Sequence, residues 1–117
     1  MKFKFEGLMI WQRAMEMGEV VYDMVGRFPE KEKFNLSSQL MRSADSVALN
    51  IAEGSIDQSN LEFKRFMGYA IRSLAEVVTC LHKAFRRSYL TKERFEVAYQ
   101  EAFELMNMMT AFKRKIK

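Results

Sequence analysis

The chain has few of the residues that build tight turns, cross-links or membrane spans. One Pro and five Gly in 117 residues are too few for the many turns of an all-β fold. The single cysteine, Cys80, excludes an intramolecular disulfide and fits a reducing compartment. No apolar run approaches the ~18 residues of a membrane helix, and the first residues lack the apolar core of a signal peptide. We therefore expect a cytoplasmic protein.

Residues for metal binding and nucleophilic catalysis are equally scarce. His82 is the only histidine, and Cys80, two positions away, would point to a different face of a helix. A zinc site needs about four N, S or O ligands, which this neighbourhood does not supply. The glycines do not cluster into a phosphate-binding loop, and no Ser-His-Asp set can be drawn around a histidine without its usual context. We expect no metal, no cofactor and no catalytic residue.

Apolar residues, by contrast, are plentiful and recur at helical spacing. They make up 49% of the chain, with ten Met and ten Phe. Four amphipathic segments follow one another with short joints, and Pro29 stops the first of them because it cannot continue a helix. The expected helices span about 7–28, about 36–53, from 59 to about 87 or 88, and from 91 almost to the end of the chain. The pattern predicts an all-α fold, a single up-down-up-down four-helix bundle that forms one domain over residues 1–117.

Capping residues mark several of the expected helix ends. Asn35 or Ser37 can cap the second helix, and Gly54 is placed to end it as a left-handed residue. Ser59 and Glu62 fit a capping box, in which hydroxyl and carboxylate satisfy free N–H groups reciprocally. Thr91 can cap the fourth helix. The joint around residues 29–35 is charged, and we expect it to be exposed.

The second helix carries a polar stripe beside its apolar seam. Short hydroxyls and amides lie there with one Arg and one Glu, and the third helix adds a further Arg and Glu. We interpret these residues as a structural polar layer between helices, because such layers fix helix register. An acid–base site is the less favoured alternative. The expected layer consists of Gln39, Arg42, Ser46, Asn50, Glu53, Arg72 and Glu76, with Arg42–Glu76 and Arg72–Glu53 as cross-helix pairs.

Several helices are apolar over two stripes, which is wider than one internal core needs. A second buried surface explains this width, so we predict a homo-oligomer; one thick core is the alternative. Trp11 and the Phe residues at helical spacing are expected in the core. Base stacking would need exposed aromatic side chains.

The net charge of +4 is unevenly distributed. Residues 1–60 hold seven Lys and Arg against nine Asp and Glu, whereas residues 61–117 hold twelve against six. The basic residues cluster at the ends of the third and fourth helices, at opposite poles of an antiparallel bundle. Nucleic acid is the commonest partner of such patches, although solubility and the helix dipole offer an alternative explanation. The candidate nucleic-acid-binding residues are Lys83, Arg86, Arg87, Lys92, Arg94, Lys113, Arg114, Lys115 and Lys117.

Four separated blocks of sequence carry a family resemblance. The longest, Q-x-x-R-[SA]-A-x-S-[VI]-x-x-N-I-A-E-G, is complete from Gln39 to Gly54. The other blocks are Leu8, Trp11, Ala14 and Tyr22; Pro29, Glu32, Phe34 and Leu36; and Phe63, Phe66, Ala70, Ser73 and Glu76. Through these blocks the chain resembles the four-helix-bundle proteins encoded in intervening sequences of bacterial 23S ribosomal RNA genes. It departs at Arg72, where similar proteins often carry Gly.

The resemblance implies a bundle that assembles as a ring, commonly a pentamer, without catalytic activity. A related branch, the accessory variability protein of diversity-generating retroelements, forms a basic barrel that works with a reverse transcriptase and nucleic acid. By analogy, we expect a non-enzymatic protein that binds RNA or DNA. The alternative is a scaffold that docks a partner protein such as a reverse transcriptase. Neither hypothesis involves a membrane or a small-molecule substrate.

Overall fold

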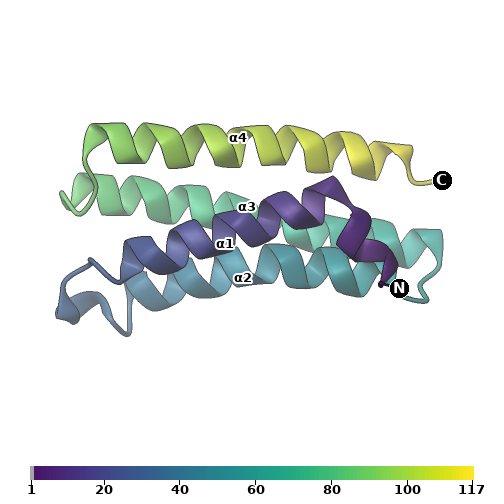
Figure 1. Cartoon of the computed structure of the whole chain (residues 1–117), viewed down its shortest axis with the longest axis horizontal. Helices are drawn as coiled ribbons and strands as arrows, with labels where there is room; N and C mark the ends of the chain where they lie inside the picture. Colours follow the sequence, from purple (N-terminus) through teal and green to yellow (C-terminus); the bar gives the residue numbers. More distant parts are fainter. Residues whose placement is uncertain (1) are drawn as a thin grey trace.

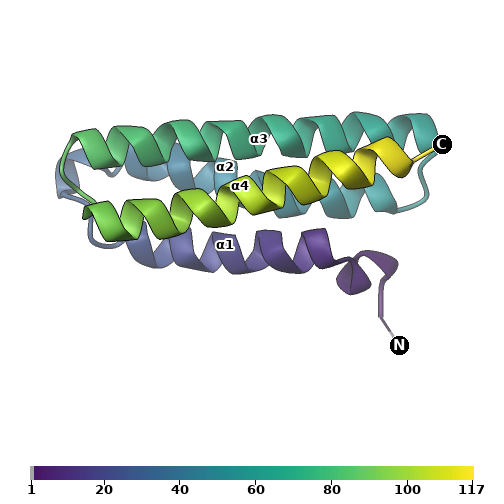
Figure 2. The same cartoon turned by 90° about the horizontal axis from the view of Figure 1, so that it is seen from above.

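A computed structural model describes residues 2–117 and confirms the all-α four-helix arrangement. Successive helices run antiparallel, and they form an elongated bundle of 43 × 25 × 23 Å (Figures 1 and 2). Two short 3-10 helices, η1 and η2, lie before α1 and between α1 and α2. The elements are η1 Lys4–Gly7, α1 Met9–Val25, η2 Glu30–Glu32, α2 Leu36–Ser55, α3 Asn60–Arg86 and α4 Lys92–Lys115.

All four helices contribute to one hydrophobic core. α2 and α3 pack most extensively against each other, whereas α1 and α4 make the fewest contacts of any neighbouring helix pair. Large aliphatic side chains such as Leu40, Leu74 and Leu105 are fully buried, and each such side chain contributes about 1.5–3 kcal/mol through removal from water. The α1–α4 side is therefore the loosest part of the bundle.

No helix among residues 2–117 combines the length and apolar character needed to span a bilayer.

Gly54 lies inside α2, and the predicted left-handed C-terminal cap is wrong. No glycine among the described residues has a positive φ, and α2 continues to Ser55. A Cβ on Gly54 would lie 2.6 Å from the Cβ of Phe66 and 3.0 Å from a ring carbon of Phe63. The position needs glycine because α3 approaches α2 so closely.

The start of α2 also differs from the expectation. Asn35 occupies the N-cap position, but its side chain caps no backbone N–H. Its amide donates instead to the Oε1 atom of Glu32 at 3.2 Å, and the same oxygen accepts from the backbone N–H of Leu36 at 3.4 Å. Glu32, one turn earlier, therefore serves one free N–H group of the helix, that of Leu36.

The caps of α3 and α4 confirm the sequence signals. Ser59 Oγ accepts from the Glu62 N–H at 3.1 Å, and Thr91 Oγ1 accepts from the Arg94 N–H at 3.2 Å. The second hydrogen bond of the capping box, in which the Glu62 carboxylate would accept from the Ser59 N–H, is replaced by an ion pair between Glu62 and Arg65 at 3.3 Å.

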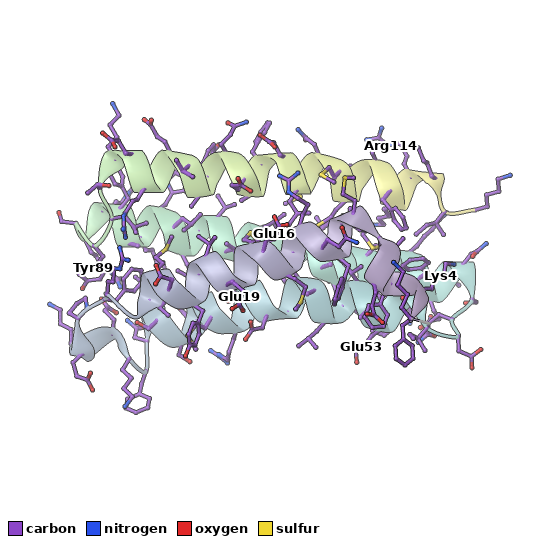
Figure 3. The ribbon with its side chains drawn as sticks, in the orientation of Figure 1. Lys4, Glu16, Glu19, Glu53, Tyr89 and Arg114 are labelled. Atoms are coloured by element: carbon purple, nitrogen blue, oxygen red, sulfur yellow. The ribbon has the colours of Figure 1, made fainter. Side chains whose placement is uncertain are left out.

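The chain leaves α3 through a left-handed residue, Ser88, with φ of 63°. The Tyr89 N–H then donates back to the Ala84 carbonyl at 2.9 Å, which is the Schellman pattern of helix termination. This turn returns Tyr89 to the end of the bundle, where it meets the α1–α2 joint (Figure 3).

Candidate nucleic-acid interface

The last turn of α4 and the residues after it carry four cations, Lys113, Arg114, Lys115 and Lys117, which we call the C-terminal patch. None of them takes part in an ion pair among the described residues. Figure 3 shows Arg114 on the outer side of α4. The helix dipole favours cations at this end, and because residues 113–117 include no acidic side chain, the charge of these cations can attract an anion.

Three further cations lie at the same end and were missed from the sequence. Lys2 and Lys4 precede α1, and Lys64 lies near the start of α3, next to Arg65, which is already paired with Glu62 (Figure 3 labels Lys4). The predicted antiparallel order of the helices could have identified Lys64, because the start of α3 must lie beside the end of α4. Glu53 in the last turns of α2 and Asp57 in the α2–α3 joint share this end and limit the positive potential.

The opposite end brings Lys92 and Arg94 beside Arg86 and Arg87, as the antiparallel order predicts. Two of these cations are engaged within the chain: Arg87 donates to Glu32 at 3.0 Å, and the Lys92 ammonium lies 4.0 Å from Glu96. Lys83, Arg86 and Arg94 are exposed and enter no ion pair among residues 2–117. Among the described residues, this end therefore offers an anion three unpaired cations, one fewer than the C-terminal patch.

Glu32 forms the centre of a buried network that the sequence did not reveal. The joint was expected to be exposed, yet Glu32 is only 5% exposed. Its Oε2 accepts from the Tyr89 hydroxyl at 2.7 Å and from Arg87 at 3.0 Å. The hydrogen bond from Tyr89, aided by Leu36 and Arg87, lowers the pKa of Glu32 against the opposing effect of burial. Hydrogen bonding to Glu32 raises the pKa of Tyr89.

The predicted polar layer forms only in part. Asn50 donates to the carbonyl and hydroxyl of Ser46 at 2.8 and 2.9 Å, and Ser73 Oγ lies 2.9 Å from Ser46 Oγ across the α2–α3 seam. Gln39 is half-buried in the same stripe.

The charged members of the layer are exposed, and the two predicted cross-helix pairs are wrong. Arg42, Glu53, Arg72 and Glu76 form no ion pair with one another. Arg42 donates to the Ser38 carbonyl at 3.4 Å, and the Arg72 guanidinium lies 5.9 Å from the Tyr69 ring. The small serines meet at the seam, so the longer charged side chains turn outward to water.

An aromatic ladder runs along the outer α3–α4 face. Ring centroids are 4.8 Å apart between Phe85 and Phe95, 5.7 Å between Phe95 and Tyr99, and 6.4 Å between Tyr99 and Phe103. His82 packs edge-on against Phe95 and Tyr99. Phe103 is 51% exposed and Phe85 is 37% exposed, so the expectation that the helical Phe residues lie in the core is wrong at these two positions.

Potential metal ligands do not gather among the described residues, and the one cysteine is buried. Within residues 2–117, no three His, Cys, Asp or Glu side chains gather closely enough to hold a metal ion. Cys80 is buried in α3, and burial, with a contribution from the charge of Glu76, raises the pKa of its thiol. A thiol in this environment is a poor nucleophile.

Comparison with known proteins agrees with this architecture. A protein of unknown function from the S23 ribosomal protein family of Bacteroides thetaiotaomicron VPI-5482 superposes with a TM-score of 0.84 at 21% identity. The match covers 91% of this chain and 99% of that one, and at this identity it establishes the fold alone. A search of curated proteins finds no relative. The sequence pattern of the family described as 23S rRNA-intervening sequence protein matches residues 6–111. The chain therefore belongs to the 23S rRNA-intervening sequence protein family.

Proposed function

We propose that the protein is a non-enzymatic, homo-oligomeric protein that associates with RNA or other nucleic acid through the C-terminal patch. The observation that carries this proposal is the set of four cations there that form no ion pair within the described chain. A cation without a carboxylate partner can pair with a phosphate without first giving up an ion pair within the protein. The family name, which refers to an RNA gene, is consistent with this partner.

Contacts of this kind are with phosphates and carry little sequence information. Each neutralised phosphate releases counterions, so affinity falls steeply with salt. Four duplex contacts would give a slope of about −3 to −4 in a plot of log affinity against log salt concentration. A ring would repeat the patch and raise the local potential further.

The test measures binding of a fluorescent structured RNA, and of duplex DNA, across a salt series. The variant Lys113→Gln, Arg114→Gln, Lys115→Gln, Lys117→Gln is expected to bind at least ~10-fold more weakly and with a shallower salt slope. Its control removes four exposed cations elsewhere: Arg27→Gln, Lys31→Gln, Arg42→Gln, Arg72→Gln. Equal losses in both variants, or no binding by the wild type at low salt, would refute the proposal.

Self-association rests on two exposed apolar faces on opposite sides of the bundle. The α1–α2 face presents Met15, Tyr22 and Leu49, and the α3–α4 face presents Tyr99 and Phe103. A hollow between α1 and α2 is lined mainly by small and apolar residues, including Ala44, Ala48 and Ala52. Two different complementary faces favour a head-to-tail contact, which closes into a ring if the rotation permits.

Native mass spectrometry tests this part of the proposal. Leu49→Ser and Phe103→Ser each remove an apolar side chain from one face, and either alone should shift the mass toward the monomer. Phe34→Ser is the control, because Phe34 is 89% exposed but lies at the end of the bundle. A wild type that stays monomeric at micromolar concentration would contradict self-association.

Docking of a partner protein is the second candidate function, and the α1–α4 side provides the observation that favours it.

A further inference from the structure

An apolar cleft opens between α1 and α4, where the bundle is most loosely packed. Its volume is about 160 Å³, and its floor includes the core side chains Val21, Val77 and Leu81. Its lips include Val20 and Val97, which are 54% and 65% exposed. Small-molecule sites measure about 300–1,000 Å³, so this cleft fits one or two aliphatic side chains of a macromolecule rather than a metabolite.

Carboxylates border the cleft on both sides. Glu16 of α1 and Glu101 of α4 line it directly, and Figure 3 shows Glu16 on the α4-facing side of α1 and Glu19 on the other side. The exposed surface of α4 that adjoins the cleft shares Val97 and Glu101 with it and adds Glu93 and Glu96. The acidic stripe from residue 93 to residue 104 extends over roughly 16 Å at 1.5 Å per residue, or about three helical turns.

One end of this stripe already binds a guanidinium. Arg13 of α1 lies 3.2 Å from Glu104 and 3.6 Å from Glu101, and these ion pairs bridge α1 to α4. Glu16 and Glu93 enter no ion pair among residues 2–117. Glu96 is paired with Lys92 at 4.0 Å, and of the two carboxylates that line the cleft only Glu16 is unpaired among the described residues. Together with Glu93, one turn before Val97, it leaves two carboxylates beside the cleft for the cations of a partner.

From these features we infer that the α1–α4 cleft docks a cationic amphipathic helix of a partner protein. An aliphatic side chain of that helix enters between Val20 and Val97, and Arg or Lys one turn away on either side pair with the carboxylates. This is the helix-in-groove mode of recognition. The carboxylates repel phosphate, so the cleft is distinct from the proposed nucleic-acid surface. It also lies on neither of the two apolar faces, so a ring built from those faces leaves it open.

The net positive charge of the chain helps to distinguish binding at the cleft from general electrostatic attraction. The protein carries a net charge of +4, so a cationic peptide is repelled by the molecule as a whole. Binding of such a peptide would therefore report a local acidic site rather than general attraction. The inference is independent of nucleic-acid binding, since each uses a different surface and can fail alone.

The test uses a labelled helical peptide with Leu on one face and Arg and Lys on the other, measured by fluorescence anisotropy with the full-length protein. Glu16→Gln, Glu93→Gln, Glu101→Gln is expected to weaken binding ~10-fold, because three exposed ion pairs that are each weak together account for about that factor. Val97→Gln places a polar amide where the aliphatic side chain packs and is also expected to weaken binding ~10-fold. The control, Glu19→Gln with Glu53→Gln and Glu76→Gln, removes three exposed carboxylates outside the cleft. A peptide with Gln in place of its cations should not bind.

Three outcomes would overturn the inference. Equal weakening by the cleft and control variants would show that the peptide senses only net charge. No binding of the peptide at micromolar concentration would show that the cleft is not a docking site. If native mass spectrometry shows that the wild-type protein is an oligomer and the cleft variant is a monomer, the cleft is occupied by a second copy of this chain. Circular dichroism of each variant establishes that a loss of binding is not a loss of fold.

Discussion

The carboxylate of Glu32 accepts a 2.7 Å hydrogen bond from the hydroxyl of Tyr89 and thereby ties the α1–α2 joint to the α3–α4 joint. This bond lowers the pKa of Glu32 below its ordinary value of 4.5. A carboxyl whose pKa is lower in the folded state stabilises that state above its unfolded pKa, and this stability is lost as pH falls through the folded pKa. We therefore expect the stability measured by urea unfolding to fall in acid, below about pH 4.5.

The Tyr89→Phe variant isolates this contribution. It should lower stability at neutral pH and flatten the acid dependence, because Glu32 loses the hydrogen bond that most lowers its pKa. Tyr22→Phe is the control, since Tyr22 is 68% exposed. The raised pKa of Tyr89 gives the opposite sign in alkali: the stabilisation is lost as pH rises through the folded pKa, above the ordinary value of 10.0. If the stability of Tyr89→Phe fell in acid as steeply as that of the wild type, this account would be wrong.

Gly54→Ala is expected to destabilise the protein by about 1–3 kcal/mol, the usual cost of overpacking. The added methyl group would lie 2.6 Å from the Cβ of Phe66, so α2 and α3 must separate. Gly18→Ala is a matched control inside α1, where the nearest atom is 3.8 Å away. That change should stabilise by about 0.5–1 kcal/mol through helix propensity. Urea unfolding of both variants measures the difference, and similar signs would contradict the close approach.

Cys80 should react with a thiol reagent only when the protein opens. The side chain is 2% exposed, and burial raises the pKa of its thiol, so both access and thiolate are scarce. With an opening free energy near 5 kcal/mol, labelling of the native protein should be about a thousandfold or more slower than in urea. Fast labelling without denaturant would show that α3 is loosely held.

The sequence predicted the helices well because apolar spacing and caps are local signals. The Ser59 and Thr91 hydroxyls cap α3 and α4 as expected, since each acts within one turn of its own position. Gly54 was misread because a glycine near a helix end usually terminates it. Only the distance to Phe66, a residue of another helix, reveals that its role is close packing.

The candidate site was predicted less completely, because charge pairing depends on side-chain direction across helices. The sequence placed Arg87 in a basic patch, whereas the fold commits it to Glu32, more than fifty residues away. The acidic α1–α4 cleft was not predicted at all. Glu16 and Glu101 belong to the first and last helices, which the predicted up-down-up-down order makes neighbours, but the sequence does not show how loosely these helices pack or which side chains line the gap between them.

The α2–α3 seam provides a direct test of which polar residues hold the helices together. Ser73→Ala should cost about 1 kcal/mol, because Ser46 loses its 2.9 Å partner across the seam. The exposed Arg42 and Glu76 should instead show almost no coupling in a double-mutant cycle, within the ~0–1 kcal/mol typical of surface charges. Thr79→Ala is the control for Ser73, since the Thr79 hydroxyl bonds only to its own helix at the Ala75 carbonyl. A coupling of about 3 kcal/mol or more between Arg42 and Glu76 would mean that they form a buried pair and that the serine seam is secondary.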